Sequence, residues 1–450
     1  MTASLQLSET GAIAQARYVC ALGALASVIA IPGAVPITHC GPGCATKQIH
    51  ALSGISGYQG GEVPVPSTNL GTREVVFGGA ETLDALITAT WERIEADLLV
   101  VLSGCIPGLI GDDLDAVVRA QRRQGVPVVL AETLGYQGTN FTGHEQVARA
   151  IIEQFVGEDD GPRNPRRVNV WALVPYQNPF WRGDLEELHR VLSGIGLEVS
   201  ILFGHSSAGI ADWQAIPRAG LNLVLSPWVG LELARTLERK YGQITLHQPA
   251  LPIGAAATSA LLRQIAALTG LPAEPVEAFI AAEERRYYLY LRDFNGFYAG
   301  CSSQYRLPSH LLVAGESAYA LAITRFMVGQ LGLEPARIVI TENPPESAQE
   351  TIRAAFRDLG DGLSTEITFA ADGEQIHRLL RDTDLTGAFP ILFATTWEGE
   401  LARQLDAPLV EIGYPATDEV VLSRSYLGYR GALALIERVY TTVVRASTAA

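Results

Sequence analysis

Apolar segments typical of strands alternate with segments typical of helices along most of this chain, and this alternation limits the fold more than any other feature. The apolar run 97–104 (DLLVVLSG) precedes a helix-forming segment at 112–125, and a second apolar run follows at 126–133. Alternating segments also begin near residue 168 and again near Ser309. Strand–helix alternation is the pattern of parallel sheets with crossover helices. We therefore predict an α/β fold of three Rossmann-like domains, each with a mainly parallel sheet flanked by helices.

The length of the chain and one polar segment suggest where these domains divide. A chain of 450 residues is too long for a single hydrophobic core. Residues 157–167 (GEDDGPRNPRR) form a polar break rich in Pro and Gly, which is typical of a domain boundary. We predict an N-terminal domain over residues 1–162, a middle domain over 163–305 and a C-terminal domain over 306–450.

The composition excludes several classes of function. A net charge of −15 argues against a nucleic-acid partner, because phosphate binding needs a basic surface. No uninterrupted apolar run reaches the ~20 residues of a membrane-spanning helix. The N-terminus lacks the basic and apolar regions of a secretory signal. An odd number of cysteines, five, favours a reducing compartment over a disulfide framework, so we expect a cytoplasmic protein with no membrane partner.

Four of the five cysteines lie within the first 105 residues, each where a loop meets a structured segment. Cys20, Cys44 and Cys105 are the candidate metal ligands, although a lone cysteine is more often a small apolar core residue. Their spacing matches no zinc ribbon, CxxC pair or ferredoxin motif. The residues alone therefore indicate only that three thiolates on three separate loops could share one iron–sulfur cluster. Three ligands are too few for a four-iron cluster, so a fourth ligand or a second subunit is implied.

Other polar residues near these cysteines have simpler interpretations. Cys40 could line the same site, but we expect it to pack beside the site, and we expect His39 to form a hydrogen bond at a strand end. Asp112 and Asp113 are interpreted as N-caps of a helix rather than as acid–base groups. Cys301 is expected to be structural or to lie on a loop. Without a Walker motif or a GxSxG elbow, the chain is not expected to hydrolyse ATP.

The motifs around these cysteines resemble those of nitrogenase component 1 proteins and nitrogenase-like reductases. The matching segments extend over nearly the whole chain: Cys20 with Gly23-Ala24, His39 to Cys44, Val76-Phe77-Gly78-Gly79, Cys105 with Leu109 to Leu114, Thr142-Gly143, Leu251 to Gly254, and Gly428 to Gly431. The resemblance implies three α/β domains with metal sites between them. It also implies that Cys20, Cys44 and Cys105 are half of the ligands of an eight-iron, P-cluster-type cluster at an interface with a second subunit.

The same resemblance indicates which subunit this is. An α-type chain of the family holds the catalytic iron–sulfur cofactor through a Cys in its middle domain and a His near its C-terminus. Here the middle segment has Ser226, and residues 423–431 contain no His. The chain is therefore expected to be a β-type subunit without catalytic residues, in an α2β2 heterotetramer whose α-type subunit carries the catalytic cofactor. An ATP-dependent four-iron reductase protein is expected to dock at Phe77.

Two departures from the family pattern bear on the substrate. Residues 45–61 differ from the corresponding stretch of molybdenum, vanadium and iron-only nitrogenase β chains, and Gly135 stands where the molybdenum type has a serine near its eight-iron cluster. These departures favour methylthio-alkane reductase, which cleaves C–S bonds of small methylthio compounds and releases methanethiol. The alternatives are a β subunit of a vanadium or iron-only nitrogenase, a cofactor-assembly scaffold of the same fold, and a non-enzymatic α/β binding module.

Overall fold

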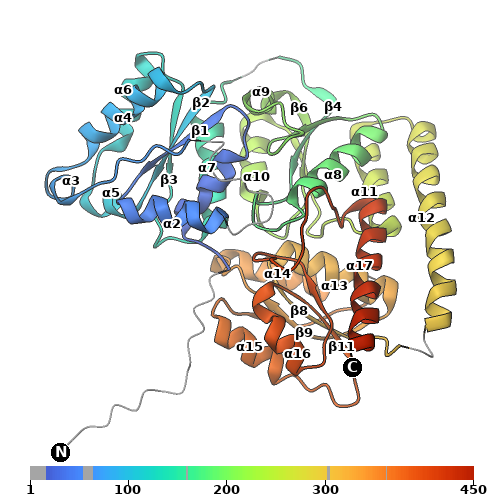
Figure 1. The fold of residues 1–450 in the computed structure, drawn as a ribbon. Helices are drawn as coiled ribbons and strands as arrows, with labels where there is room; N and C mark the ends of the chain where they lie inside the picture. The colour runs from blue at the N-terminus through green and yellow to red at the C-terminus, as the bar shows by residue number, and fades with distance from the viewer. Residues whose placement is uncertain (1–16, 54–63, 159–160, 302–304, 361, 450) are drawn as a thin grey trace, which may run out of the picture.

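The chain folds into three parallel sheets flanked by helices (Figure 1). The structure is a computed structural model and describes residues 17–53, 64–158, 161–301, 305–360 and 362–449. The first sheet has the order β1-β2-β3, the second β5-β4-β6-β7 and the third β10-β9-β8-β11-β12, and all the strand pairs are parallel. The predicted α/β fold is therefore confirmed. The glycine-rich segment after Ser53, residues 54–63, lies outside the described residues.

The strands have the following bounds: β1 (Ala34–His39), β2 (Leu98–Ser103), β3 (Val128–Glu132), β4 (Asn164–Trp171), β5 (Glu198–Ile201), β6 (Ala219–Val224), β7 (Ile244–His247), β8 (His310–Gly315), β9 (Glu334–Ile340), β10 (Thr368–Phe369), β11 (Pro390–Ala394) and β12 (Leu409–Glu411). The 3-10 helices are η1 (Ala21–Ala24), η2 (Ile216–Arg218) and η3 (Thr396–Glu398).

The α-helices around the first sheet are α1 (Leu25–Ile29), α2 (Pro42–Ser53), α3 (Thr72–Phe77), α4 (Ala80–Arg93), α5 (Cys105–Ile110), α6 (Leu114–Arg123) and α7 (Asn140–Gln154). Those that follow are α8 (Trp181–Gly194), α9 (Ile210–Gln214), α10 (Leu231–Tyr241), α11 (Gly254–Thr269), α12 (Ala273–Cys301), α13 (Ser317–Leu331), α14 (Glu346–Arg357), α15 (Gly373–Arg381), α16 (Gly399–Gln404) and α17 (Gly428–Ala449). None of the described helices is both long and apolar enough to span a bilayer.

The first sheet shows why its strands are uninterrupted apolar runs. β2 is the central strand, and all six of its residues are buried, as expected for a parallel strand covered by helices on both faces. His39 at the end of β1 is in register with Ser103 of β2, and Ser103 is in register with Glu132 of β3. The loops that follow these three strands therefore leave the sheet at the same edge, which is where α/β sheets bind their ligands.

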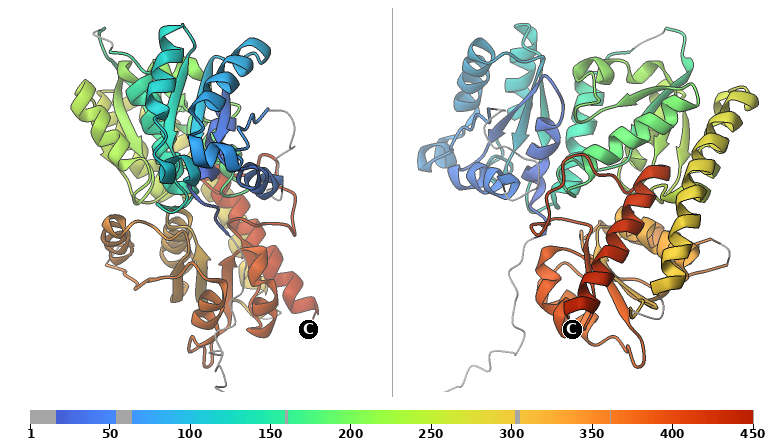
Figure 2. Two further views of the ribbon diagram at one scale, coloured as in Figure 1. Left: turned by 90° about the vertical axis from the view of Figure 1, so that its left-hand side faces the viewer. Right: turned by 45° about the vertical axis from the view of Figure 1, so that its right-hand side comes forward.

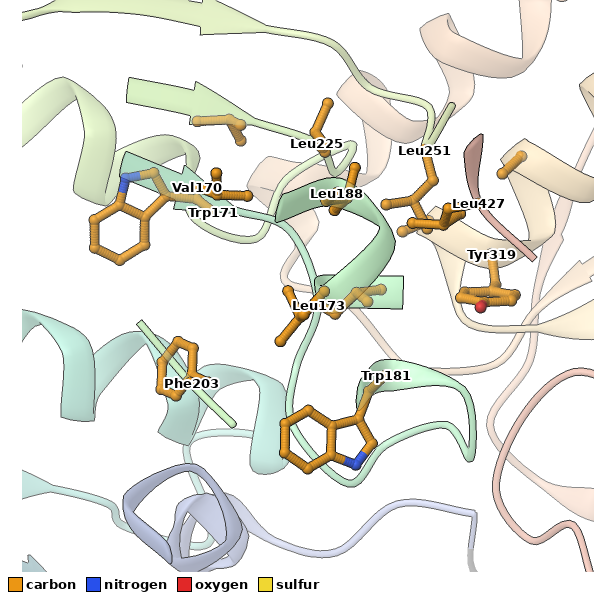
Figure 3. Packing of buried hydrophobic residues seen from close by; sticks show 14 of the residues in the cluster. Val170, Trp171, Leu173, Trp181, Leu188, Phe203, Leu225, Leu251, Tyr319 and Leu427 are labelled. Atoms are coloured by element: carbon orange, nitrogen blue, oxygen red, sulfur yellow. The ribbon is translucent and has the colours of Figure 1, made fainter. Parts of the chain in front are cut away.

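The largest cluster of buried apolar side chains joins parts of the chain that are distant in sequence. Figure 3 shows Trp171 at the end of β4 and Trp181 of α8 packed in one region with Tyr319 of α13 and Leu427 before α17. The last helix, α17, packs against α8, α11 and α12 (Figure 2). The proposed boundaries at 162/163 and 305/306 lie between strands of different sheets. However, α17, from the end of the chain, packs against α8 and α11 of the predicted middle domain. The division into domains remains a prediction.

Candidate metal centre

The three candidate cysteines lie at the starts of helical segments near the carboxyl edge of the first sheet. Cys20 immediately precedes η1, and Cys105 is the first residue of α5, two positions after β2. Cys44 lies inside the first turn of α2, which begins at Pro42. Backbone N–H groups at helix starts favour negative charge on nearby sulfur.

The loop after β3 brings these cysteines together at Gly135. A methyl group built on Gly135 would lie 3.1 Å from Cys105 Sγ and 3.3 Å from Cys20 Sγ. Burial raises the pKa of the Cys44 thiol, and the adjacent Cys20 and Cys105 thiols raise this pKa further, so the third sulfur lies within electrostatic reach of the other two. Cys20 and Cys105 thus lie together beside a residue without a side chain, and Cys44 of a third segment lies within electrostatic reach of both.

Two hydrogen bonds hold sulfur atoms of this group. The backbone N–H of Gly135 donates to Cys105 Sγ over 3.2 Å, and the side-chain amide of Gln48 donates to Cys20 Sγ over 3.4 Å. Donors of this kind stabilise thiolate ligands and tune a cluster that they bind. The sequence interpretation missed Gln48, although its position one helical turn after Cys44 on α2 was a usable signal.

The exposure of the cysteines separates the three candidate ligands from Cys40. Cys20 and Cys44 are exposed and Cys105 is half-buried, whereas Cys40 is 1% exposed and belongs to the apolar core. Cys40 therefore packs beside the site, as its sequence suggested. Cys301 is the last residue of α12 rather than part of a loop.

The donor chemistry fits part of an iron–sulfur site. In the described part of the chain, no group of three or more His, Cys, Asp or Glu side chains is arranged to hold a metal ion by itself. The three thiols form an open set instead, with two sulfur-bearing residues exposed at the surface. Thiolates are the ligands of iron–sulfur clusters, and a set open on one side fits such a cluster when further ligands come from another chain.

Of the two aspartates expected to cap a helix, only Asp113 does so. Asp113 caps α6, because its carboxylate accepts the N–H of Ala116, but Asp112 does not cap that helix. Asp112 accepts the N–H of Gly79 over 2.9 Å and lies 3.7 Å from His39 Nε2. His39 is fully buried at the end of β1, where its carbonyl oxygen accepts the N–H of Gly104 and its ring has the Asp112 carboxylate as its polar neighbour. Burial lowers the pKa of His39 and so favours the neutral ring, whereas the charge of Asp112 acts in the opposite direction and raises this pKa.

An exposed apolar surface lies beside the cysteine group. Phe77, the last residue of α3, is 82% exposed, and Val76 before it is also exposed. α3 contacts α5, which begins at Cys105 and carries the exposed Leu109. Large exposed apolar side chains that gather in one place are typical of a docking surface.

Comparisons with known proteins agree with this architecture. The family model described as nitrogenase component 1 type oxidoreductase matches residues 20–444. One of the subunits of the light-independent protochlorophyllide reductase of Bradyrhizobium sp. (strain ORS 278) is 28% identical over 278 residues, 60% of this chain and 51% of that protein, so the chain spans about half the length of this relative. The nitrogenase molybdenum-iron protein beta chain of Frankia alni is 24% identical over 453 residues, 94% of this chain and 81% of that protein.

A solved structure has the same fold. The structure of nitrogenase Cp1 at pH 6.5 superposes with a TM-score of 0.79 at 19% sequence identity and covers 98% of this chain and 95% of the other. At this level of identity the likeness concerns the fold alone.

Proposed function

Because the chain belongs to the nitrogenase component 1 type oxidoreductase family, we propose that it is the β-type subunit of a nitrogenase-like reductase complex. In this proposal Cys20, Cys44 and Cys105 supply three thiolates to an eight-iron cluster shared with an α-type subunit. The observation that carries the proposal is that Cys20 and Cys105, from separate segments, lie together beside Gly135, with Cys44 of a third segment within electrostatic reach of both. When bound, such a cluster supplies electron uptake and release.

The assignment as a β-type subunit is supported by the residues at the positions where an α-type chain would hold its cofactor. Ser226 is 2% exposed, and its hydroxyl oxygen accepts the N–H groups of Trp228 and Val229. Ser226 is therefore engaged in a buried turn. In the C-terminal block Tyr426 is fully buried, and its ring lies 4.2 Å from that of Phe180, centroid to centroid. These residues pack the interior, and we place the catalytic cofactor on the α-type partner.

The apolar surface of Phe77, Val76 and Leu109 is our proposed docking site for an ATP-dependent four-iron reductase protein. Its position next to Cys105 suits electron delivery, because electron transfer needs a short separation between donor and acceptor. The side chains of this surface would exclude water from the contact with the reductase. We expect two copies of this chain and two α-type subunits to form an α2β2 heterotetramer, to which the reductase protein binds.

For the reaction we propose reductive cleavage of C–S bonds in small methylthio compounds, with methanethiol as a product. The support is the pair of sequence departures, at residues 45–61 and at Gly135, from nitrogenase β chains. The packing around Gly135 adds to it, because a side chain there would crowd Cys20 and Cys105. Protochlorophyllide reduction is a second candidate, favoured by the 28% identity to the protochlorophyllide reductase chain over 60% of this chain.

The test is anaerobic co-purification of the chain with the products of neighbouring genes, followed by metal analysis. We expect a brown complex that contains iron and sulfide. Cys44→Ala should lose most of the iron of the shared cluster, whereas Cys40→Ala, its matched control, should keep most of it, because the buried Cys40 thiol is a neighbour of Cys44 rather than a ligand in this proposal. An iron-free complex, or equal iron in both variants, would contradict the proposed ligand set.

Assays with dimethyl sulfide, dinitrogen and protochlorophyllide, run side by side with the reductase and ATP, separate the substrates. Methanethiol from dimethyl sulfide supports the proposed reaction. Ammonia without methanethiol would assign the complex to nitrogen fixation, and reduced protochlorophyllide would favour the second candidate. Iron without turnover of any substrate would point to a cofactor-assembly scaffold.

A further inference from the structure

Gln48 connects the candidate cluster site to a buried cavity behind it. This residue lies on α2, is 3% exposed and directs its amide nitrogen at Cys20 Sγ, 3.4 Å away. We propose that Gln48 is a positioning residue for Cys20, and that a buried water between Gln48 and Asn140 holds its amide in this orientation. The inference rests on the proposed function, because it assigns to Gln48 a role toward the shared cluster.

The cavity has room for such a water. Its volume is about 30 Å³ for the centre of a water-sized sphere, and one water needs about 10–15 Å³. Its polar lining includes Arg17, Gln48, Asn140, Gln177 and Tyr414. These residues come from separate parts of the chain, so the cavity lies where the first sheet's helices meet the loop after β4 and the segment after β12.

The hydrogen bonds around the cavity leave two acceptors open. Asn140 uses its amide nitrogen to donate to Gln177 Oε1 over 2.6 Å, and Gln177 in turn donates to the carbonyl oxygen of Arg17 over 3.3 Å. Tyr414 donates its hydroxyl proton to the carbonyl of Ala51. Among the described residues, the side-chain oxygens Gln48 Oε1 and Asn140 Oδ1 are both buried without a partner.

Two buried oxygens that line one cavity need a donor between them. A carboxamide oxygen only accepts hydrogen bonds, whereas a water molecule has two protons to donate. Buried waters of this kind bridge otherwise unsatisfied groups and belong to the structure. With the water in place, the oxygen of Gln48 is satisfied in the cavity and its N–H₂ group faces the sulfur.

This orientation has a consequence for the cluster. Hydrogen bonds to cysteine sulfur raise the reduction potential of an iron–sulfur cluster, because they stabilise the extra negative charge of the reduced state. Gln48 would supply one such bond to Cys20 from a residue that is not itself a ligand. Removing the donor should therefore lower the potential without removing a ligand.

The experiment compares Gln48→Leu and Gln48→Glu with Gln124→Leu in the co-purified complex. Gln124 is an exposed residue after α6, so its variant controls for the loss of a glutamine amide far from the cysteines. Iron content is measured first, and the midpoint potential is then followed by absorption and electron paramagnetic resonance. We expect all three variants to keep iron. The potential should be more negative than wild type in Gln48→Leu and unchanged in Gln124→Leu.

Gln48→Glu has the same shape but carries an ionisable acceptor toward the sulfur. Its potential should become pH-dependent, approaching the wild-type value at low pH, where the protonated carboxyl can donate to sulfur. The carboxylate charge alone would also shift the potential with pH, so this variant tests how close the side chain lies to the cluster, and the Gln48→Leu comparison decides the role of the hydrogen bond. An unchanged potential in a fully iron-loaded Gln48→Leu complex overturns the role of Gln48.

A crystal structure of the wild-type chain tests the water separately. Electron density within hydrogen-bond distance of both Gln48 Oε1 and Asn140 Oδ1 is expected, and an empty cavity overturns this part of the inference. If wild-type protein contains no iron, the proposed function fails. The same crystal structure then still decides whether Gln48 faces Cys20 and whether the water is present.

Discussion

At the scale of single residues, Gly135 is the position that lets Cys20 and Cys105 lie close together. A methyl group there would lie 3.1 Å from both Cys105 Sγ and Cys20 Cβ, closer than the ~3.5–4.0 Å of a comfortable contact between heavy atoms. Its backbone N–H also donates to Cys105 Sγ. The missing side chain thus makes room for Cys20 and Cys105, and the backbone N–H holds Cys105.

We expect Gly135→Ala to retain less iron than wild type and to lower the free energy of unfolding by about 1–3 kcal/mol, a typical cost of overpacking. The cysteines would have to move apart to admit the methyl group. Iron analysis and thermal unfolding of the co-purified complex measure both effects. Gly157→Ala is the matched control, because a methyl group at Gly157 meets no atom within 4 Å. Equal iron and stability in the two variants would contradict the crowding argument.

At the scale of elements, the start of α13 concentrates buried carboxyl groups. Glu316 accepts the N–H groups of Ala318 and Tyr319 and thereby caps α13, while Glu342 accepts those of Ser317 and of the Trp228 indole. Burial raises the pKa of Glu316 to about 8, and the charge of Glu342 contributes to this shift. Burial also raises the pKa of Glu342 to about 7.

These shifts predict that the protein loses stability as the pH rises. The pKa of Glu316 increases from 4.5 to about 8 on folding, so its folded form binds the proton more tightly than the unfolded form does. The resulting stability is complete below the unfolded value and is lost as the pH rises through about 8. In Glu316→Gln the fall in Tm between about pH 6 and about pH 9 should be shallower than in wild type.

Calorimetry across this range measures the slope, and Glu346→Gln is the control because Glu346 is exposed in the first turn of α14. The slope, rather than the stability at one pH, is the quantity to compare, because Gln also changes the cap of α13. Parallel curves for wild type and Glu316→Gln would show that Glu316 does not carry the pH dependence.

At the scale of the whole molecule, the segment before Cys20 ties the first and third sheets together. The Arg17 guanidinium is buried and pairs with the fully buried Glu398 of η3, which also lies 3.2 Å from His377 Nε2. Tyr18 shares a hydrogen bond of 2.6 Å with Thr341, after β9. The cysteine that follows this segment is thus held in place by contacts to the C-terminal part of the chain.

We expect Arg17→Met to lower the free energy of unfolding by about 3–5 kcal/mol, because it leaves the carboxylate of Glu398 buried without its main counter-charge. The double variant Arg17→Met/Glu398→Gln should recover part of this loss, since no buried charge is then left unpaired. Thermal unfolding of the single and double variants measures the difference. A double variant less stable than the single one would contradict this account.

Much of the fold was predictable from local patterns, and the exceptions have a common cause. Strand–helix alternation correctly indicated parallel sheets, and the Asp113 cap followed from its position before an amphipathic helix. Asp112 was misjudged and Gln48 was missed because each contacts a residue far away in the sequence. Local spacing placed Gln48 one turn after Cys44 on α2, but it could not show that the amide reaches Cys20.

By itself the sequence determined which segments become buried strands and which helices cover them, because hydrophobic periodicity and helix-end residues act over short distances. It also singled out Cys20, Cys44 and Cys105 as a group. Only the tertiary structure decided that Cys20 and Cys105 meet at Gly135 with Cys44 within electrostatic reach, and that Gln48 and a cavity lie behind Cys20. The physical reason is the parallel register of β1, β2 and β3, which brings loops far apart in the chain to one edge of one sheet.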